Sequence, residues 1–522
     1  MITMWPSLKP VDNSIEAKAA ENYTIHELGV PPSLLMENAG RAVTNRVTEI
    51  LQQFLGTKAH VAIFCGPGNN GADALVCARQ LLGHHFDISI FFTAERNRFG
   101  ESLTRELELL EKICARLTKP TLRFMRDLKQ LENLENKALV IVDGIFGAGL
   151  SRAPQGLSLA AIEYINFLRQ TLGTHNCRVV SIDVPSGLSL EASLPLGAHV
   201  RADYSITFGH LKRCHVSEPT KKLVGKVEVC DIGLYYSKPA SNFYTDSQEP
   251  LNFLLKPLGK SSNKGDFGHV AILEGHVNFI GASRLAARAA LRVGAGLVTL
   301  LTSKTPSLHP SDLAEFMKKH EKFTTPDFFK KISGLVIGPG LGQKPHDLAR
   351  ARSLLKSSVS YVKNIILDAD ALALIHDAKL DLKSNTLICT PHPQEAAKLL
   401  GVSTQLIERD RFLAIENLAK LAFNPTGITI WVLKGATTLI RQEPYGTIAL
   451  SGDAPILATG GSGDMLAGAI GGLLAQSRSP LAAVVLATSL QICAARRFSE
   501  STKGIFPSEL ADRFPSLLQR SL

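Results

Sequence analysis

A glycine-rich segment, Gly460-Gly461-Ser462-Gly463-Asp464, precedes an apolar stretch that predicts a helix over 465–474. Glycines at a helix N-terminus leave backbone N–H groups unobstructed, and with the helix dipole these groups bind an anion such as a transferring phosphoryl group. Asp464 would lie in the first turn, where its carboxylate can accept a proton from an attacking hydroxyl. The segment also fits a plain turn in which Ser462 caps the helix. Because the chain lacks a Walker A motif, this is not a P-loop site.

A second set of polar loops follows apolar runs in the first half of the chain: Gly66–Asp73, Asp143–Leu150 and Asp183–Gly187. The first loop contains the G-x-G-x-x-G spacing of a Rossmann dinucleotide site, but Pro67 removes a backbone donor and Asp73 would repel phosphate. The loop therefore fits a cation and a polar ligand, or a turn in which Asp73 caps the following helix. Carboxylates at the ends of parallel strands are expected to converge on one crevice.

The elements that position these loops are short apolar runs that alternate with amphipathic segments. They lie at 60–65, 139–142, 179–182, 270–273, 335–337, 365–367, 386–389 and 428–433. Buried runs of this kind predict parallel sheets covered by helices, which makes the fold class α/β. The pattern weakens over 235–262, so we predict two domains, residues 1–236 and residues 237–522.

Composition narrows the class of protein. The 522 residues are 45% hydrophobic and 20% charged, as in ordinary globular proteins. The net charge of +10 is scattered without a basic arm, so we expect small anionic ligands and no nucleic acid. Eight sparse cysteines without a CxxC pair argue against disulfides and structural zinc, and they favour a cytoplasmic location. The chain shows no signal peptide, and its longest apolar stretch is too polar to span a bilayer, so we expect no membrane partner.

Residues 1–234 resemble the NAD(P)H-hydrate epimerase (YjeF N-terminal) family, through the sequence LMENAG at 35–40, the three loops above, and Phe208-Gly209 followed by Lys212. The resemblance implies a Rossmann-like three-layer domain that binds hydrated NADH or NADPH (NADHX or NADPHX). It implies a potassium ion held by Asn70, Asp143 and Ser186, and Asp183 as the catalytic acid/base. The implied substrate contacts are Asn69, Asn70, Gly71, Ala72, Asp73, Gly147, Ala148, Gly149, Leu150, Ser151, Arg152, Ala153 and Asp183.

This chain departs from the family pattern G-G-D-G, because Ala72 and Ala74 replace two glycines. If either position needs a positive φ, alanine would strain the loop by about 1 kcal/mol or more. If both lie at the start of a helix, alanine is harmless or stabilising.

Residues 255–500 resemble the NAD(P)H-hydrate dehydratase family, a branch of the ribokinase-like kinases. The matching segments are 264–269, Gly281-Ala282, 338–342, 368–372, 390–395, 434–437 and 460–464. The resemblance implies a ribokinase-like α/β domain in which ADP, or alternatively ATP, with Mg²⁺ phosphorylates the hydroxyl of the S epimer. It implies nucleotide contacts from Lys434, Gly435, Ala436, Thr437, Thr438 and Gly463, and hydrate contacts from Ala282, Gly342, His392 and the catalytic Asp464.

Together these patterns predict a fused repair enzyme whose first domain interconverts the R and S hydrates and whose second domain dehydrates the S form. The alternative is a ribokinase-like small-molecule kinase that carries a non-catalytic N-terminal binding module. We expect only small-molecule ligands for either protein, and a homo-oligomeric state.

Overall fold

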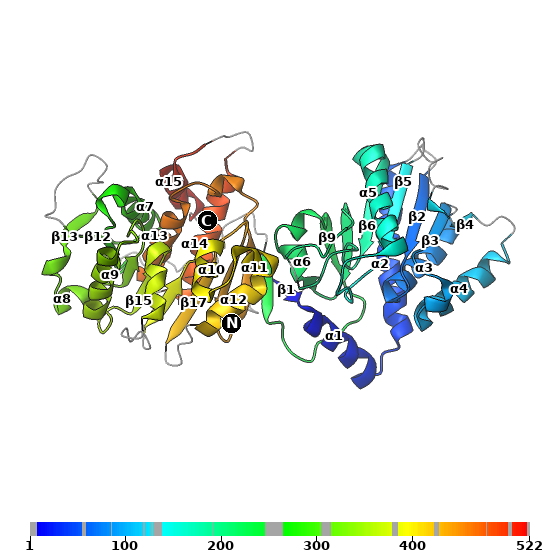
Figure 1. The fold of residues 1–522 in the computed structure, drawn as a ribbon, viewed down its shortest axis with the longest axis horizontal. Helices are drawn as coiled ribbons and strands as arrows, with labels where there is room; N and C mark the ends of the chain where they lie inside the picture. The colour runs from blue at the N-terminus through cyan, green and yellow to red at the C-terminus, as the bar shows by residue number, and fades with distance from the viewer. Residues whose placement is uncertain are drawn as a thin grey trace. The chain divides into compact units, whose positions relative to one another are not determined.

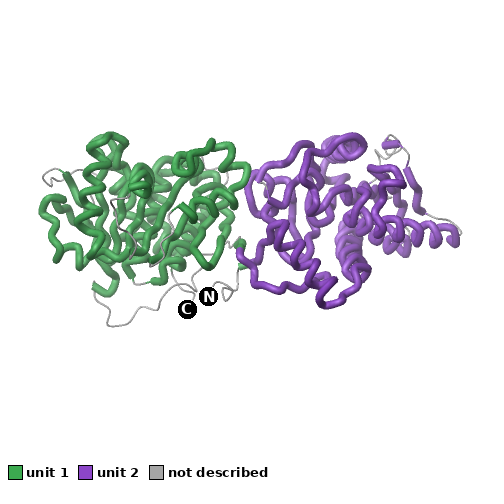
Figure 2. The backbone as a smooth tube through the Cα atoms, turned by 60° about the horizontal axis from the view of Figure 1, so that its bottom comes forward, with its two compact units in different colours: residues 1–8, 242–522 green, residues 9–241 purple. Residues whose placement is uncertain are grey.

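The computed structural model describes residues 8–54, 59–84, 86–117, 121–125, 127–128, 138–191, 193–245, 265–303, 315–377, 385–421, 427–476, 478–498 and 504–518. The chain forms two compact units, one of residues 9–241 and one of residues 1–8 and 242–522 (Figure 2). Lys264, the first residue of the motif at 264–269, lies outside the described residues. Among the described residues, we find no helix with both the length and the apolar character needed to cross a bilayer.

The N-terminal unit is built on a fully parallel sheet in the order β4-β3-β2-β5-β6-β7-β9 (Figure 1). Its strands are β2 (Ala59–Cys65), β3 (Asp87–Phe92), β4 (Leu122–Met125), β5 (Ala138–Gly144), β6 (Cys177–Ile182), β7 (Tyr204–Phe208) and β9 (Lys226–Cys230). A further parallel pair joins β1 (Lys9–Asp12) to β8 (Leu211–Lys212). The predicted parallel strands of this half are confirmed.

Helices cover both faces of this sheet. Alternate residues of β2 face opposite ways, so Val61 and Ile63 join the core beneath α2 (Pro32–Gln53), α3 (Asn69–Leu81) and α4 (Glu101–Cys114). Ala62 and Phe64 join the core beneath α5 (Gly156–Asn176). This arrangement confirms the predicted three-layer architecture.

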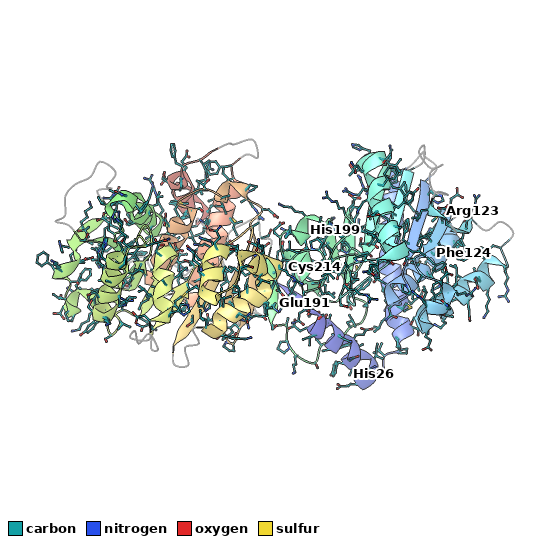
Figure 3. All side chains as sticks on the ribbon, viewed as in Figure 1. His26, Arg123, Phe124, Glu191, His199 and Cys214 are labelled. Atoms are coloured by element: carbon teal, nitrogen blue, oxygen red, sulfur yellow. The ribbon has the colours of Figure 1, made fainter. Side chains whose placement is uncertain are left out.

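Glu191, labelled in Figure 3, connects two short helices of the same unit. Its carboxylate accepts a 2.6 Å hydrogen bond from the Ser14 backbone N–H at the start of α1 (Ser14–Asn22). It also lies 3.6 Å from the guanidinium of Arg213 in α6 (Arg213–Val216). The segment that follows β6 therefore ties the N-terminal helix to the end of β8.

The sheet of the C-terminal unit runs in the order β13-β12-β11-β14-β15-β16-β17-β18-β19-β10. Its strands are β10 (Asn242–Thr245), β11 (His269–Leu273), β12 (Leu297–Thr302), β13 (Met317–His320), β14 (Gly334–Ile337), β15 (Asn364–Leu367), β16 (Thr386–Cys389), β17 (Ile428–Leu433), β18 (Thr437–Gln442) and β19 (Gly446–Ser451). The strands from β13 to β17 are parallel, as predicted. Beyond β17 the sheet continues with β18, which is antiparallel to both its neighbours and was not predicted from the sequence.

Helix α13 lies at the centre of this unit, where it contacts β11, β14, β15 and the helix α7. The helices are α7 (Ile280–Arg292), α8 (Pro326–Phe329), α9 (Pro345–Ser358), α10 (Pro393–Leu400), α11 (Thr404–Arg409), α12 (Arg411–Leu421), α13 (Ser462–Ala475), α14 (Pro480–Arg496) and α15 (Pro507–Leu517). Glycines let α13 approach its neighbours closely: a Cβ on Gly472 would lie 2.6 Å from the Ala290 carbonyl oxygen, and one on Gly468 would overlap the Ala286 carbonyl. The contact with α7 therefore fixes the position of α13, and with it the position of its N-terminal end.

Replacing Gly468 with alanine should destabilise the C-terminal unit by about 1–3 kcal/mol, because the added Cβ meets backbone that cannot move aside. Gly281→Ala is the matched control in α7, since a Cβ there meets nothing within 4 Å. We would measure urea unfolding through the fluorescence of buried Trp431 in a Trp5→Phe background. Equal midpoints for the two variants would contradict the packing described here.

Candidate functional site

In the N-terminal unit, the loops after β2, β5 and β6 meet at one edge of the sheet. Helix α3 begins at Asn69, immediately after the first loop. The side-chain amide of Asn70 donates to the carbonyl oxygen of Phe146, at 2.9 Å, and to that of Ile182, at 3.1 Å. These two bonds tie the first loop to the other two, and they confirm that the three loops converge.

Asp143 lies at this junction with none of its surface exposed. Its carboxylate accepts hydrogen bonds from the Ser181 hydroxyl (2.8 Å), the Ser186 backbone N–H (2.9 Å) and the Ser186 hydroxyl (2.5 Å). Burial raises the pKa of Asp143 although these hydrogen bonds oppose the shift. Within the described residues no lysine or arginine pairs with it, and no three His, Cys, Asp or Glu side chains form a metal cluster. The structure thus brings Asn70 and Ser186 close to the Asp143 carboxylate, which is buried and has hydrogen bonds but no cationic side chain as a partner among the described residues.

Asp183 follows β6 in the left-handed region, with a φ of 60°, and is 8% exposed. Its carboxylate accepts a 2.8 Å hydrogen bond from the Thr207 hydroxyl and lies 3.3 Å from the Lys212 ammonium. Burial alone would raise the pKa of Asp183, but Lys212 and Thr207 outweigh burial and hold this pKa below its ordinary value. Lys212 also donates to the carbonyl oxygens of Phe208 and His210, at 2.9 and 2.8 Å. A buried cation therefore keeps Asp183 ionised.

His215 completes this arrangement, and sequence reasoning missed it. Its Nδ1 accepts a 3.0 Å hydrogen bond from the Lys212 backbone N–H, so its Nε2 carries the proton and donates to the Asp183 carbonyl oxygen at 3.1 Å. Burial, followed by the charge of Lys212, lowers the pKa of His215 to about 4. The ring is therefore neutral at pH 7, and its two hydrogen bonds connect the backbone of Lys212 to that of Asp183.

Asp73 does not cap α3, because the cap residue is Gly68 and Asp73 is the fifth residue of the helix. It is 9% exposed, and burial together with the charge of Asp183 raises its pKa well above the ordinary value. Ala72 and Ala74 are buried within the same helix and neither has a positive φ. The alanines are thus ordinary helix residues, and they do not strain the loop.

The remaining predicted contacts of this unit lie on the loop after β5. A Cβ on Gly147 would lie 2.7 Å from the Asn70 side-chain oxygen, so this glycine lets the loop approach α3. The segment 148–153 has exposed residues at Ala148, Gly149 and 151–153. Its role in substrate contact stays a prediction.

In the C-terminal unit, Gly461 is the cap residue of α13 and adopts a φ of 96°. The Ser462 hydroxyl donates instead to the Leu457 carbonyl oxygen at 2.8 Å, so the alternative in which Ser462 caps the helix is wrong. Asp464 lies in the first turn, as predicted. The helix N-terminus thus keeps backbone N–H groups that no side chain of the cap residue satisfies.

The Lys434 ammonium lies beside this helix end. A Cβ on Gly463 would lie 3.3 Å from its Nζ, which itself lies 2.8 Å from the Asp368 carboxylate and 3.9 Å from that of Glu395. Burial would lower the pKa of Lys434, but the carboxylates of Asp368 and Glu395 raise it overall. Burial, followed by the charges of Asp368 and Glu395, raises the pKa of Asp464 to about 6, although Lys434 opposes the shift. The N-terminus of α13 therefore has a cation, Lys434, beside an acid, Asp464, whose raised pKa suits it to accept a proton.

Arg411 supports the loop at 434–438 through hydrogen bonds to its backbone. This residue was not identified from the sequence. This guanidinium is buried and donates to the carbonyl oxygens of Lys434 and Thr437, both at 3.1 Å. It also fills the space in which a Cβ on Gly435 would lie. Arg411 thereby fixes both ends of the turn that contains Lys434.

The predicted hydrate contacts fall into two groups. A Cβ on Gly340 would lie 3.1 Å from the Ala282 Cβ, so the glycine loop that contains Gly342 packs on the start of α7. The Gly342 backbone N–H donates to the Asp370 carboxylate at 3.1 Å, so Asp370 anchors this loop. His392 caps α10 through a 3.2 Å bond from the Gln394 backbone N–H.

Glu395 links His392 to the cluster at the end of α13. Its carboxylate accepts a 2.8 Å hydrogen bond from the His392 backbone N–H and lies 3.2 Å from His392 Nε2. The same side chain approaches Lys434. Neither Glu395 nor Thr390, whose hydroxyl donates to Asp368 at 2.6 Å, was singled out from the sequence. Both belong to the segment 390–395 after β16, which was identified from the sequence as a site element.

Comparison with known proteins matches two segments of the chain to two different families. A family model described as YjeF-related protein N-terminus matches residues 33–214, and one described as NAD(P)H-hydrate dehydratase matches residues 270–516. The bifunctional NAD(P)H-hydrate repair enzyme Nnr of Moorella thermoacetica is 32% identical over 516 residues, which cover 94% of this chain and 93% of that protein. The enzyme of the same description from Coxiella burnetii is 32% identical over 469 residues, which cover 88% and 89%.

Among solved structures, the chain is similar over part of its length to ADP/ATP-dependent NAD(P)H-hydrate dehydratase from Bacillus subtilis, co-crystallised with ATP/Mg²⁺. That structure is 26% identical, with a TM-score of 0.43, and the match covers 51% of this chain and 94% of the other. The full-length relatives, by contrast, are matched along almost all of both chains. The chain therefore belongs to the family of bifunctional NAD(P)H-hydrate repair enzymes, which join an epimerase domain to a dehydratase domain.

Proposed function

We propose that the two halves of the chain act in sequence on hydrated NADH and NADPH. The domain of residues 1–236 interconverts the R and S hydrates, and the domain of residues 237–522 converts the S hydrate to NADH or NADPH with ADP as phosphoryl donor. The observation that carries this proposal is the N-terminus of α13, where the Lys434 ammonium and the Asp464 carboxylate flank Gly463. The homo-oligomeric state stays a prediction.

In the dehydratase reaction, Asp464 accepts the proton of the hydrate's hydroxyl as its oxygen attacks the terminal phosphorus of the donor. Lys434 and the N–H groups at the start of α13 stabilise the negative charge of the transferring group. The bond from phosphorus to the nucleoside monophosphate breaks, and a phosphate ester remains on the ring. Phosphate then leaves with the oxygen while the neighbouring ring carbon loses a proton, which restores the double bond. Phosphorylation is needed because hydroxide is a poor leaving group.

The nucleotide and the hydrate occupy different elements around this helix end. Lys434, Gly435, Ala436, Thr437 and Thr438, on the turn that Arg411 supports, contact the nucleotide together with Gly463. Ala282, Gly342, His392 and Asp464 contact the hydrate. Mg²⁺, when bound, supplies positive charge to the phosphates, and it is usually held by only one or two carboxylates. Asp368 and Glu395, which both approach Lys434, fit that role.

In the epimerase domain, Asn70, Asp143 and Ser186 hold a potassium ion, and Asp183 serves as acid/base. Two features support the ion. The Asn70 side-chain N–H groups donate to two carbonyl oxygens, which orients the amide and leaves Oδ1 as the atom that would contact a cation, and Asp143 is buried without a cationic side chain as its partner among the described residues. Hydroxyl, amide and carboxylate oxygens suit a hard cation, and buried charges are normally paired or bound to metals. The ion would supply the positive charge that the buried Asp143 carboxylate otherwise lacks as a partner.

Asp464→Asn tests the dehydratase assignment. With the S hydrate and ADP, wild-type protein should restore absorbance at 340 nm, and the variant should do so about 10²–10⁴-fold more slowly because the general base is lost. Near-wild-type turnover of the variant would contradict the assignment. A stable phosphorylated alcohol formed by the wild type would instead favour the alternative, a small-molecule kinase with a non-catalytic N-terminal module.

The pH dependence of dehydration should report the raised pKa of Asp464, which is about 6. Because a base must be unprotonated, kcat/KM for the S hydrate should rise with pH between 5 and 7 and level off above this range, with its midpoint near the Asp464 pKa. Initial rates at saturating ADP, corrected for acid loss of NADH, measure this profile. A profile that is flat or that falls across this range would exclude Asp464 as the base.

Asp143→Asn should abolish the activation of epimerisation by potassium. Epimerisation would be titrated with KCl against tetramethylammonium chloride at constant ionic strength. Ser181→Ala is the matched control, because Ser181 donates to Asp143 but is not proposed as a ligand. An unchanged potassium response in Asp143→Asn, or its loss in Ser181→Ala alone, would rule out Asp143 as a ligand.

A further inference from the structure

An aromatic side chain lies exposed beside the proposed hydrate contacts of the C-terminal unit. Phe279 ends the short helix η8 (Val277–Phe279), immediately before α7, and 56% of its surface is exposed. Ala282, three residues further along the chain, is one of those contacts. A single exposed phenyl ring is common on protein surfaces, so its meaning depends on what surrounds it.

Phe279 packs against the glycine loop that follows β14. A Cβ on Gly340 would lie 3.0 Å from the Phe279 Cβ and 3.1 Å from the Ala282 Cβ, so these three residues meet at one point. The His276 backbone N–H donates to the Gly340 carbonyl oxygen at 2.8 Å, and the Phe279 backbone N–H donates to the His276 carbonyl oxygen at 2.8 Å. The loop ends at Gly342, a second proposed hydrate contact. Phe279 therefore lies where the two segments that carry these contacts meet.

Buried charges hold the turn that contains Phe279 in place. The Arg284 guanidinium is buried and donates to the Glu274 carboxylate at 3.0 Å and to the Ile280 carbonyl oxygen at 2.9 Å. Arg350 of α9 donates to the Glu274 carbonyl oxygen at 2.7 Å. Both ends of the turn are thus anchored, and a phenyl ring on a fixed backbone loses little conformational entropy when a ligand stacks on it.

Two imidazole rings extend the aromatic surface beside Phe279. The His276 ring centroid lies 6.1 Å from that of Phe279 and 6.4 Å from that of His346, in the first turn of α9. The His346 Nε2 lies 3.0 Å from the buried Asp347 carboxylate, which orients this exposed ring. A Cβ on Gly342 would lie 3.5 Å from the His276 Cβ. Phe279, His276 and His346 thus form an aromatic patch along the glycine loop.

The glycine loop connects the aromatic patch to the reacting end of the site. Gly338, at its start, packs on the backbone of Asp368, the acid that lies beside the N-terminus of α13. Gly340 and Gly342 follow and pack on residues of the patch. The loop has no side chain at three of its five positions. A dinucleotide whose hydrated ring lies at Asp464 can therefore extend along this loop to the patch.

We propose that the aromatic patch binds the adenine of the hydrate by stacking, chiefly on Phe279, a role that rests on the proposed function of the C-terminal domain. Adenine is flat and aromatic, and such bases stack on aromatic side chains. The hydrated nicotinamide ring contains saturated carbons and is puckered, so it is the poorer partner for stacking. The patch thereby holds the far half of the dinucleotide and takes no part in the chemical step.

Phe279→Ala in the full chain tests this role with the S hydrate of NADH and saturating ADP. The variant should raise KM for the hydrate by about 5- to 100-fold, the loss expected for one base–aromatic contact, with kcat changed by less than about threefold. KM for ADP should be unchanged, and Phe279→Tyr, which keeps an aromatic ring, should retain the wild-type KM for the hydrate. Phe323→Ala is the matched control, because Phe323 is 69% exposed and also lies beside a histidine, His320, but belongs to a different turn.

A truncated substrate identifies which half of the hydrate Phe279 contacts. The S hydrate of reduced nicotinamide mononucleotide lacks the adenosine half, so its kcat/KM, measured at high enzyme concentration, should be the same for Phe279→Ala and wild type. An unchanged KM of Phe279→Ala for the NADH hydrate, or an equal loss of kcat/KM with both substrates, would overturn the proposal. A wild-type protein that forms no NADH from the S hydrate and ADP would instead refute the proposed dehydratase function.

Discussion

The pairing of Lys434 with Asp368 at the start of α13 is the interaction on which the C-terminal unit depends. The carboxyl ends of buried parallel strands hold several carboxylates in a region of low dielectric, where unpaired charge costs several kcal/mol. One ammonium, 2.8 Å from Asp368 and close to Glu395, offsets this cost. Because Gly463 has no side chain, the Lys434 ammonium has room beside it. Arg411 holds the backbone of Lys434 in place through a hydrogen bond to its carbonyl oxygen. Burial, followed by the charges of Asp368 and Glu395, then raises the pKa of Asp464 to about 6 because Lys434 offsets these effects only in part.

The N-terminal unit meets the same constraint with different groups. Lys212 forms an ion pair with Asp183, and the neutral His215 forms hydrogen bonds with the backbone of both residues. Asp143 receives only hydrogen bonds, so a bound cation is the natural compensation there. Asp73 receives neither, and its burial together with the charge of Asp183 raises its pKa. Among the described residues, the three acids thus have three different surroundings: an ion pair for Asp183, hydrogen bonds for Asp143 and neither for Asp73.

The sequence predicts most of the fold because buried parallel strands and the glycine loops after them are local patterns. The strands β16 and β17 begin and end where the apolar runs do, and Asp464 lies where the glycine segment predicts it. The antiparallel β18 was not predicted, because the segment 434–438 was interpreted as a ligand-binding loop, whereas its short turn also joins β17 and β18 as a hairpin. The role of Arg411 was also missed, because it precedes Lys434 by 23 residues and no local pattern links the two. Helix starts were misjudged where Gly68 and Gly461, which have no side-chain donor or acceptor, proved to be the caps.

Dehydration at the start of α13 requires that a phosphoryl group is transferred to the hydroxyl of the hydrate before that oxygen leaves as part of phosphate. A single stoichiometry measurement tests it directly, with the S hydrate and ADP labelled with ³²P at its terminal phosphorus. We expect one labelled inorganic phosphate and one AMP for each NADH formed. NADH formation without release of the label, or a label trapped in a stable ester, would contradict the claim.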